Sequence, residues 1–490
     1  MESPFMQHVQ DIFARLQGRN LIVVAAVWVV LLGIGLSCGL GVIELPTGGE
    51  AAQSDVQPSS TPVPGLTPTS GAGVGETGNQ DPNPTETEPG TSDPETPMNP
   101  EPTATPEGAM TLPTPTREPN ESAEDDVEVS RPWGEFGYGI AAHGISMADY
   151  TMGQVDDHLG LGWVKQQVRW DHFSSELGQM DWSGYDVMVD AANERNLKVL
   201  MSVVGSPKWS RTYFDENPEA APPDDINLFV DFLGELVDRY QGRIHAIEVW
   251  NEQNLDREWD TPEGVSPESY VEMLRLSYQE IKSRDPDIIV VSGALSPTSG
   301  RQMDPNNPNR VIWMDDFDYF DRMIELNALS YCDCVGAHHN GINMPPDVEW
   351  DEGYNDPTAT FRGPFDNPHH SWSFKSTLWG YHERIQRAKR NTPLCVTEFG
   401  WATSEGFDGT PPGFEFADDN SLEEQAEWDV EAFQLMREWG FVHLAFLWNL
   451  DYSYKGGIGA TDPNAPYSIL DLQGAARPAF YAIADMPKIP

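Results

Sequence analysis

The sequence has few cysteines and few basic residues. Only 4 of its 490 residues are cysteine, and 29 Lys and Arg stand against 78 Asp and Glu, giving a net charge of −49. So few cysteines do not indicate a disulfide framework. We therefore expect Cys332, Cys334 and Cys395 to be buried free thiols. A chain this acidic repels nucleic acid and other polyanions, which favours neutral partners, although the charge also serves solubility.

Basic residues are absent from residues 20–116. Within that stretch, residues 21–43 form an uncharged apolar run, long enough to cross a bilayer core, which needs about 20 residues. Two arginines lie shortly before the run, so residues 1–20 are expected in the cytoplasm and the rest of the chain outside. We expect a single-pass membrane anchor at 21–43. A cleaved signal peptide and a lipidated Cys38 are the alternatives, and all three export the downstream chain.

Large apolar residues are nearly absent from residues 46–130, where Pro, Thr, Gly, Ser, Glu and Asp dominate. Such a segment cannot bury enough apolar surface to offset the entropy lost on ordering, so we expect it to be disordered. A flexible chain of this length spans roughly 50 Å, and prolines extend it further. The segment is predicted to be a linker that holds a folded domain, residues 131–490, away from the membrane.

Residues 131–490 lack a Gly-rich phosphate loop after the first apolar run and lack any second kind of pattern. Short apolar runs rich in β-branched residues alternate there with amphipathic stretches of helical length. The predicted strands are 137–143, 163–169, 197–204, 244–251, 287–293, 333–338, 393–399 and 442–449. The predicted helices lie near 183–196, 225–240, 267–284, 315–328, 374–390 and 421–439.

This alternation predicts a parallel sheet. Eight strands in one domain predict an α/β fold of the (β/α)8 TIM-barrel class. A doubly wound sheet is the alternative, and the missing phosphate loop argues against it. Two local signals can be checked. Ser421 and Glu424 form a capping-box pattern at the start of the last predicted helix, and Gly440 is expected to end that helix.

In a (β/α)8 barrel the reactive groups lie at the C-terminal ends of the strands. Polar and aromatic residues gather at the predicted ends, which carry His143, Arg169, Asn251, Glu252, His338, His339, Asn340, Glu398, Trp448 and Asn449. Hydrolysis of a glycosidic bond requires two carboxyl groups, one to protonate the leaving oxygen and one to attack the anomeric carbon or activate water. Glu252 and Glu398 supply such a pair, whereas Glu248 is expected to be an interior ion-pair residue.

The segments that carry these glutamates are Val249-Trp250-Asn251-Glu252-Gln253-Asn254 and Val396-Thr397-Glu398-Phe399-Gly400-Trp401. They resemble clan A of the glycoside hydrolases, the 4/7 superfamily of retaining β-glycosidases, and the resemblance covers about residues 131–486. Within the clan, the chain resembles the cellulase-like family 5 and the xylosidase-like family 39. The resemblance implies that Glu252 is the acid/base and Glu398 the nucleophile.

The resemblance also implies several substrate-binding or supporting residues. Asn251 matches the residue that binds the sugar 2-hydroxyl, Arg169 the arginine that supports the nucleophile, and Trp448 the tryptophan under the −1 sugar. His338 and His339 are also expected to bind substrate. Family 5 carries His-x-Tyr where this sequence has His338-His339-Asn340, so another tyrosine or His339 is expected to replace the missing tyrosine.

A double displacement requires different protonation states for the two glutamates. Glu398 must be ionised to attack, and a nearby Arg169 favours the charged form. Glu252 must first be protonated, which repulsion from Glu398 and a poorly solvated aromatic wall favour. The retaining mechanism predicts carboxyl groups about 5–5.5 Å apart.

A metal site is not predicted, because the His-x-His on strand one of metal-dependent amidohydrolase barrels is absent around His143, and His338 with His339 does not supply it. No other cofactor is expected. The expected protein is a monomeric, membrane-anchored, extracytoplasmic glycosidase for β-linked neutral polysaccharide or oligosaccharide. The alternative is a surface carbohydrate-binding or scaffold protein built on an inactive barrel. The connection at about residues 341–373 is expected to wall the substrate cleft.

Overall fold

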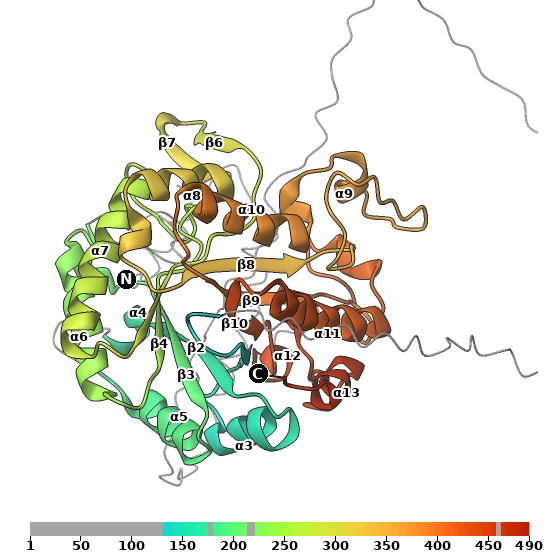
Figure 1. Cartoon of the computed structure of the whole chain (residues 1–490), viewed down its shortest axis with the longest axis horizontal. Coiled ribbons are helices and arrows are strands. Elements are labelled where there is room, and N and C mark those ends of the chain that lie inside the picture. The colour runs from blue at the N-terminus through green and yellow to red at the C-terminus, as the bar shows by residue number, and fades with distance from the viewer. Residues whose placement is uncertain (1–130, 175–179, 213–220, 457–461, 490) are drawn as a thin grey trace, which may run out of the picture. The chain divides into compact units, whose positions relative to one another are not determined.

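The computed structural model describes residues 131–174, 180–212, 221–456 and 462–489 (Figure 1). The expected cytoplasmic segment 1–20, membrane segment 21–43 and linker 46–130 lie outside these residues and stay predictions. Among the described helices, none combines the length and apolar character that a membrane crossing requires.

Eight parallel strands form the central sheet, in the order β5-β4-β3-β2-β1-β10-β9-β8. The strands are β1 Gly137–Ala141, β2 Trp163–Arg169, β3 Lys198–Val204, β4 Ala246–Val249, β5 Ile289–Ser292, β8 Val335–Gly341, β9 Leu394–Trp401 and β10 Val442–Leu447. Isolated parallel bridges join Val291 to Cys334 and Leu295 to Ala337, so the two outer strands of the sheet also meet. The sheet therefore closes into a barrel, and the eight predicted strands are confirmed.

Helices surround the barrel on its outside (Figure 1). The six predicted helices are α5 Ser183–Glu194, α6 Ile226–Arg239, α7 Pro267–Arg284, α8 Asp316–Glu325, α10 Phe374–Arg387 and α11 Leu422–Trp439. The sequence did not predict α3 Ala148–Gly153, α4 Trp170–Phe173, α9 Gly363–Asp366, α12 Tyr452–Gly456 and α13 Pro478–Asp485. It also missed an antiparallel hairpin, β6 Arg301–Asp304 with β7 Asn307–Met314, which is inserted after β5.

The predicted ends of α11 are confirmed. Ser421 Oγ accepts the Glu424 backbone N–H at 3.1 Å, and Glu424 Oε2 accepts the Ser421 backbone N–H at 2.8 Å. Gly440 follows the helix with a φ of 71°, a left-handed conformation that glycine adopts without steric cost. These caps satisfy backbone groups that the helix itself leaves unpaired.

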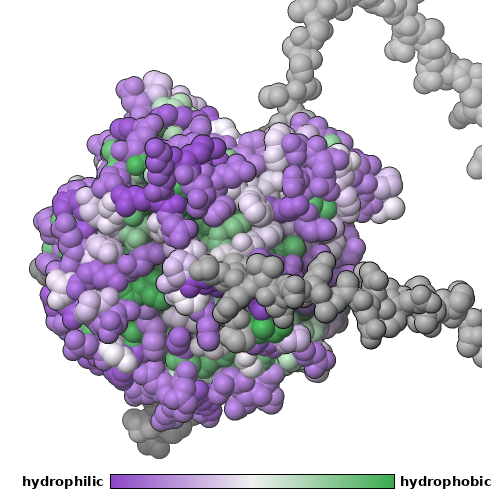
Figure 2. All heavy atoms as spheres, in the orientation of Figure 1, coloured by the Kyte–Doolittle hydropathy of each residue, from purple (hydrophilic) through white to green (hydrophobic). Residues whose placement is uncertain are grey.

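Apolar helix faces pack on the outside of the barrel. In α6, the buried residues Phe229, Phe232, Leu233 and Leu236 recur at helical spacing and join the main core cluster. Each such side chain contributes about 1.5–3 kcal/mol when fully buried. On the face that Figure 2 shows, most of the surface is hydrophilic and the apolar residues form patches.

A second apolar cluster fills the barrel interior at the strand starts. Its members are Trp163, Leu200, Ala246, Val291, Cys334, Cys395, Leu444 and Phe446. Cys334 and Cys395 form a disulfide with a Cα–Cα distance of 5.7 Å, so the expectation of free thiols is wrong for these two. Cys332 is free and buried, as predicted. Neighbouring strands β8 and β9 bring the pair together across 61 residues of sequence, a proximity that spacing along the chain does not reveal.

Candidate active site

A buried lysine lies inside the barrel, above the apolar cluster. Side chains alternate along a strand, so Lys165 on β2 points inward like Trp163 two residues earlier. Its Nζ lies 3.0 Å from Glu398 Oε1 and 3.4 Å from Glu248 Oε2. Burial lowers the pKa of Lys165, but the charges of Glu248 and Glu398 outweigh burial and raise the pKa above its usual value. Lys165 therefore stays cationic between two carboxylates.

The inward direction of Glu398 depends on an irregularity in β9. Cys395 faces the interior, so regular alternation would point Thr397 inward and Glu398 outward. The register of β9 with both β8 and β10 shifts just before or at Glu398, as in a β-bulge, which re-aims the later side chains of the strand. Thr397 Oγ1 consequently donates to Glu248 Oε1 at 2.7 Å, while the next residue, Glu398, contacts Lys165.

Glu252 reaches the barrel mouth through an unusual backbone turn. Trp250 and Glu252 have φ values of 78° and 43°, in the left-handed region that residues other than glycine seldom adopt. The Trp250 ring is fixed in the outer core between Phe229 and Trp259, with ring centroids 5.3 and 5.5 Å away. Strained residues of this kind persist only where the surroundings hold them, and they gather at functional sites. The Glu252 carboxyl is fully buried.

The two glutamates predicted to be catalytic both lie close to one imidazole nitrogen. His338 Nδ1 lies 3.2 Å from Glu252 Oε1 and 3.8 Å from Glu398 Oε2. The two lengths sum to 7.0 Å, so Glu252 Oε1 and Glu398 Oε2 lie at most 7.0 Å apart. For these two oxygens, that limit includes the separation of about 5–5.5 Å in retaining glycosidases and only the lower end of the range of about 6.5–9.5 Å in inverting ones. Burial lowers the pKa of His338, but the charge of Glu398 and the hydrogen bond to Glu252 raise it above its usual value.

Two further side chains contact the glutamates. Arg257 donates to Glu252 Oε2 at 2.8 Å and favours its ionised form. Asn340 Nδ2 donates to Glu398 Oε2 at 3.3 Å. Asn340 thus contacts the expected nucleophile from the position where family 5 carries tyrosine. Tyr467 also lies near the pair: burial, followed by the charges of Glu398 and Glu252, raises the pKa of its phenol.

Several buried polar atoms at this site have no hydrogen-bond partner within the described part of the chain. They are Nδ2 and Oδ1 of Asn251, Oδ1 of Asn340 and Nε1 of Trp448. Buried polar atoms are almost always paired in folded proteins, so unpaired atoms beside two carboxyl groups point to a polar ligand. Asn251 and Trp448 both carry such unpaired atoms, and their substrate-binding role stays a prediction.

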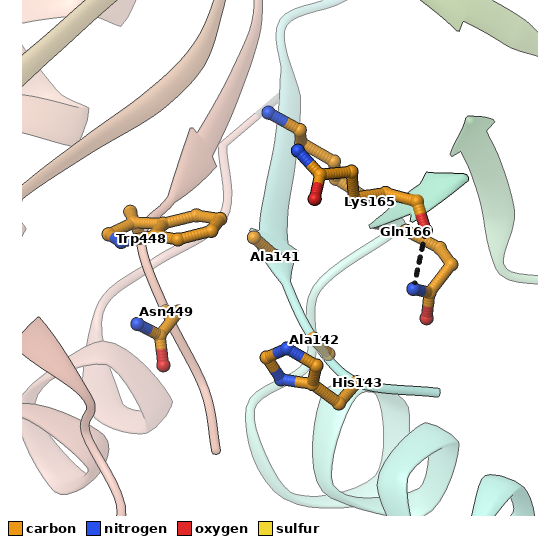
Figure 3. A pocket seen from close by; sticks show the side chains of 8 residues that line it. Ala141, Ala142, His143, Lys165, Gln166, Trp448 and Asn449 are labelled. Atoms are coloured by element: carbon orange, nitrogen blue, oxygen red, sulfur yellow. Dashed lines mark hydrogen bonds between the residues drawn. The ribbon is translucent and has the colours of Figure 1, made fainter. Parts of the chain in front are cut away.

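Trp448 stands at the end of β10, followed by a cis peptide bond to Asn449. Figure 3 shows Trp448 and Lys165 on either side of Ala141 from β1. The Lys165 Nζ lies 5.9 Å from the centroid of the Trp448 ring. A cavity of about 10 Å³ lies among these residues and His143, enough for a water molecule but not for a sugar.

The long connection between β8 and α10 packs next to the site. Its residues Ile342, Met344, Val348 and Trp372 share an apolar cluster with Phe414, Phe416, Trp448 and Tyr467. The connection therefore packs against Trp448 and Tyr467 near the glutamates, and its role as a wall of the cleft stays a prediction.

Two expected site residues are placed differently. Arg169 pairs with Asp171 at 3.1 Å, and the cation on Glu398 is Lys165 instead. His339 lies on the opposite face of β8 from His338, edge-on to Phe374 at 5.7 Å. Burial lowers the pKa of His339 to about 4. Adjacent residues of a strand point to opposite faces, so His338 and His339 cannot both line the pocket.

The histidines at the ends of β1 and β8 do not converge on one point. His143 pairs with Asp451 at 3.3 Å, while His338 and His339 occupy opposite faces of β8. Sequence reasoning also missed the roles of Lys165 and Arg257. The role of Lys165 could have been predicted from the sequence. It lies within an apolar strand that is buried on both faces, and a buried lysine needs acidic partners. The role of Arg257 could not have been predicted in this way.

No protein-family model matches the chain. Solved structures with a similar fold include a family 39 glycoside hydrolase from the gut symbiont Bacteroides cellulosilyticus WH2, with 15% identity and a TM-score of 0.51 over 73% of this chain and 64% of that one. A monomeric β-xylosidase from Caulobacter crescentus CB15 has 17% identity and a TM-score of 0.48 over 71% of this chain and 67% of that one. Xylanase 10B from Thermotoga petrophila RKU-1 has 16% identity and a TM-score of 0.47 over 72% and 94%.

The chain thus spans less than two thirds of the family 39 structure. Similarity at this level of identity establishes the barrel fold. The family 39 structure, with a TM-score of 0.51, is a clan A glycoside hydrolase, so the resemblance that the sequence indicates is confirmed for the fold.

Proposed function

We propose that the barrel domain is a retaining glycosidase that cleaves β-linked neutral polysaccharide or oligosaccharide by double displacement. One observation carries the proposal: two buried glutamates from the ends of different strands approach the same imidazole nitrogen. They lie at the C-terminal ends of the barrel strands, where enzymes of this fold hold their reactive groups.

In the first step, the Glu398 carboxylate attacks the anomeric carbon while the glycosidic C–O bond breaks. The leaving oxygen takes a proton from Glu252. Arg257 favours the ionised form of Glu252, so this proton must be supplied from nearby. His338, whose pKa is raised, lies 3.2 Å from Glu252 and is the group placed to supply it. Glu252 and His338 then act as one proton-holding pair.

In the second step, water attacks the glycosyl ester, Glu252 accepts the proton of that water, and Glu398 is released as a carboxylate. While the ester exists, Glu398 carries no charge. Lys165 keeps Glu248 as its counter-ion at 3.4 Å, so the buried cation is never left alone. Glu248 thus keeps the interior charge balanced through the cycle, which limits the cost of forming the intermediate.

Substrate recognition rests on the unpaired polar atoms and on Trp448. The Asn251 amide has both a donor and an acceptor free for a sugar hydroxyl. The net charge of −49 disfavours polyanionic glycans, which supports a neutral substrate.

The test is hydrolysis of a panel of aryl β-glycosides by the full chain. We expect turnover that Glu398→Ala abolishes and that azide restores as a glycosyl azide, because azide replaces the missing nucleophile. A 2-fluoro glycoside should label Glu398, as mass spectrometry of peptides would show. Glu427→Ala, on the exposed side of α11, is the matched control and should leave turnover unchanged. Glycan binding without turnover by the wild type would instead identify a binding or scaffold protein on an inactive barrel.

We also propose that the domain acts outside the cytoplasm, anchored by residues 21–43. The disulfide Cys334–Cys395 supports this proposal, because structural disulfides persist mainly in oxidising compartments. Protease added to intact cells should release the domain from the cell surface. Protection of the domain from protease until the cells are lysed would refute export.

A further inference from the structure

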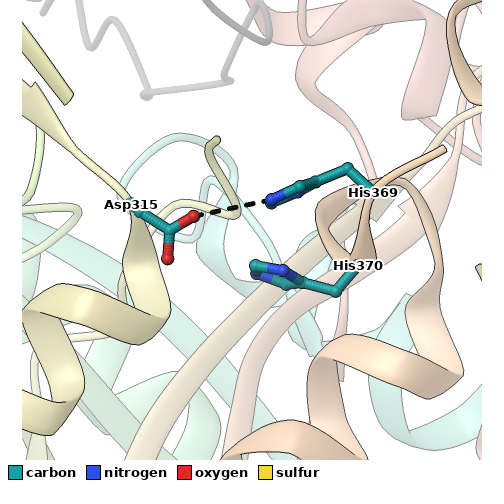
Figure 4. A group of neighbouring side chains, drawn as sticks. All are labelled: Asp315, His369 and His370. Carbon is teal, nitrogen blue, oxygen red and sulfur yellow. Dashed lines mark ion pairs between the residues drawn. The ribbon is translucent and has the colours of Figure 1, made fainter. Parts of the chain in front are cut away.

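A second group of convergent side chains lies on elements that do not carry the glutamates. Asp315 precedes α8, while His369 and His370 lie at the end of the connection that leads to α10 (Figure 4). One potential metal-binding atom from each of the three lies within 4.8 Å of the others. Two imidazoles and one carboxylate are ligands that zinc and similar divalent transition metals prefer, whereas calcium and magnesium prefer oxygen ligands alone.

The contact between His369 and Asp315 has the length of two atoms that share an ion. His369 Nε2 lies 3.6 Å from Asp315 Oδ2, which is long for a hydrogen bond. Zinc binds nitrogen and oxygen at about 2.0–2.2 Å, so tetrahedral ligand atoms lie about 3.4 Å apart. The other oxygen of Asp315 accepts the Phe317 and Asp318 backbone N–H groups. The carboxylate is thus held by the helix cap, with Oδ2 turned to the histidine.

The His370 imidazole is fixed by a carboxylate and by an aromatic ring. His370 Nε2 lies 3.0 Å from Asp316 Oδ1, and the His370 ring stacks on Phe317 with centroids 3.6 Å apart. Asp316 is itself fixed by the Tyr381 hydroxyl, which donates to Oδ2 at 2.9 Å. With Nδ1 as its ligand atom, His370 would make through Nε2 the carboxylate contact that metal-binding histidines almost always make through their second nitrogen.

The protonation of His369 allows the same role. Its Nδ1 lies 3.0 Å from Ser371 Oγ. When Nδ1 carries the proton and donates it to this hydroxyl, Nε2 presents its lone pair toward Asp315. In the arrangement that the structure shows, Nδ1 accepts the Ser371 backbone N–H at 3.3 Å, so Nε2 carries the proton, 3.6 Å from Asp315 Oδ2. An ion that binds Nε2 must displace this proton, as metal ions do when they bind histidine.

We propose that Asp315, His369 and His370 bind one divalent cation of the zinc class, with water completing its coordination. The ion joins the start of α8 to the end of the connection between β8 and α10. That connection packs against Trp448. The site is therefore structural: it fastens a wall of the substrate cleft and takes no part in the reaction itself.

The test uses the purified full chain, stripped with a chelator and titrated with ZnCl2 by calorimetry. We expect one zinc per chain and a rise of several degrees in the melting temperature. Asp315→Asn keeps the helix cap, because asparagine caps as well as aspartate, but it removes the charged ligand. This variant and His369→Ala should bind zinc at least tenfold more weakly. His158→Ala, an exposed histidine outside the group, should bind like the wild type.

Co²⁺ gives a second readout that needs no variant. Visible absorption typical of four-coordinate cobalt with nitrogen ligands, displaced by one equivalent of zinc, supports the site. The proposal would be overturned if the wild type bound no zinc. It would also be overturned if Asp315→Asn and His369→Ala bound zinc as tightly as the wild type, whatever the glycosidase assays show.

Discussion

At the strand starts the barrel is filled by apolar side chains and closed by a disulfide, whereas at the strand ends it holds buried ionisable groups. The same strands serve both regions: β9 carries Cys395 in the apolar cluster and, three residues later, Glu398 in the charged site. Buried charges seldom improve stability over well-packed apolar residues. The two regions therefore have different tasks. The strand starts stabilise the fold, whereas the buried charges at the strand ends lower its stability and are the groups of the proposed reaction.

The strongest test of this division is Lys165→Met. It leaves Glu248 and Glu398 buried without their cation, and breaking a buried pair in this way costs about 3–5 kcal/mol. Activity should fall by about 10²–10³-fold as well, because a preorganised charge at the reacting group is lost. Urea unfolding and kcat/KM on an aryl glycoside would measure the two effects.

The double variant Lys165→Met with Glu248→Gln separates them. Removing the second charge should restore much of the stability but none of the activity, because Glu398 still lacks its cation. Recovery of both together would show that Lys165 acts only through folding.

The opposite result is expected at the strand starts. Replacing Cys334 and Cys395 by alanine should lower the free energy of unfolding by about 4 kcal/mol, from loss of the loop constraint. Turnover per folded molecule should not change. Cys332→Ala, a free and buried thiol, is the control. A loss of kcat in the double variant at a temperature where it is fully folded would contradict the division.

His443, on β10 near the strand starts, should make the barrel sensitive to acid. Burial lowers its pKa to about 4, while an unfolded histidine titrates at about 6.5. The unfolded chain therefore binds more protons between these values, and stability falls as pH falls through them, by at most about 3 kcal/mol. His443→Asn should flatten the acid side of a stability profile measured by urea midpoints.

His338, at the strand ends, should act with the opposite sign and a smaller effect. Its pKa is raised, so its contribution to stability is complete below the unfolded pKa of about 6.5 and is lost as pH rises through the folded value. His338→Asn should therefore lower stability most in mild acid and little in base. A uniform loss at all pH values would mean that His338 supports the fold by packing alone.

The barrel itself was predictable because its signals are local. Strand and helix periods, the Ser421 cap and the glutamates at strand ends can all be read from short segments. Sequence reasoning missed two kinds of feature: the face of a strand to which a side chain points, and contacts between residues that are distant in sequence. His339 points away from His338 because side chains alternate along a strand. Glu398 points inward only because of a register shift in β9, which no residue of the sequence indicates. The pairing of Cys334 with Cys395 required the strand order.

The disulfide closes a covalent ring of chain that contains β8, the cleft connection and α10. A protease that nicks the exposed part of that connection, near Trp350 and Tyr354, would cut the backbone without releasing a fragment. The two pieces would remain tethered at the barrel base, where the cut does not reach. The protein would thereby survive one cleavage as a single, two-piece molecule, visible only when a gel is run under reducing conditions.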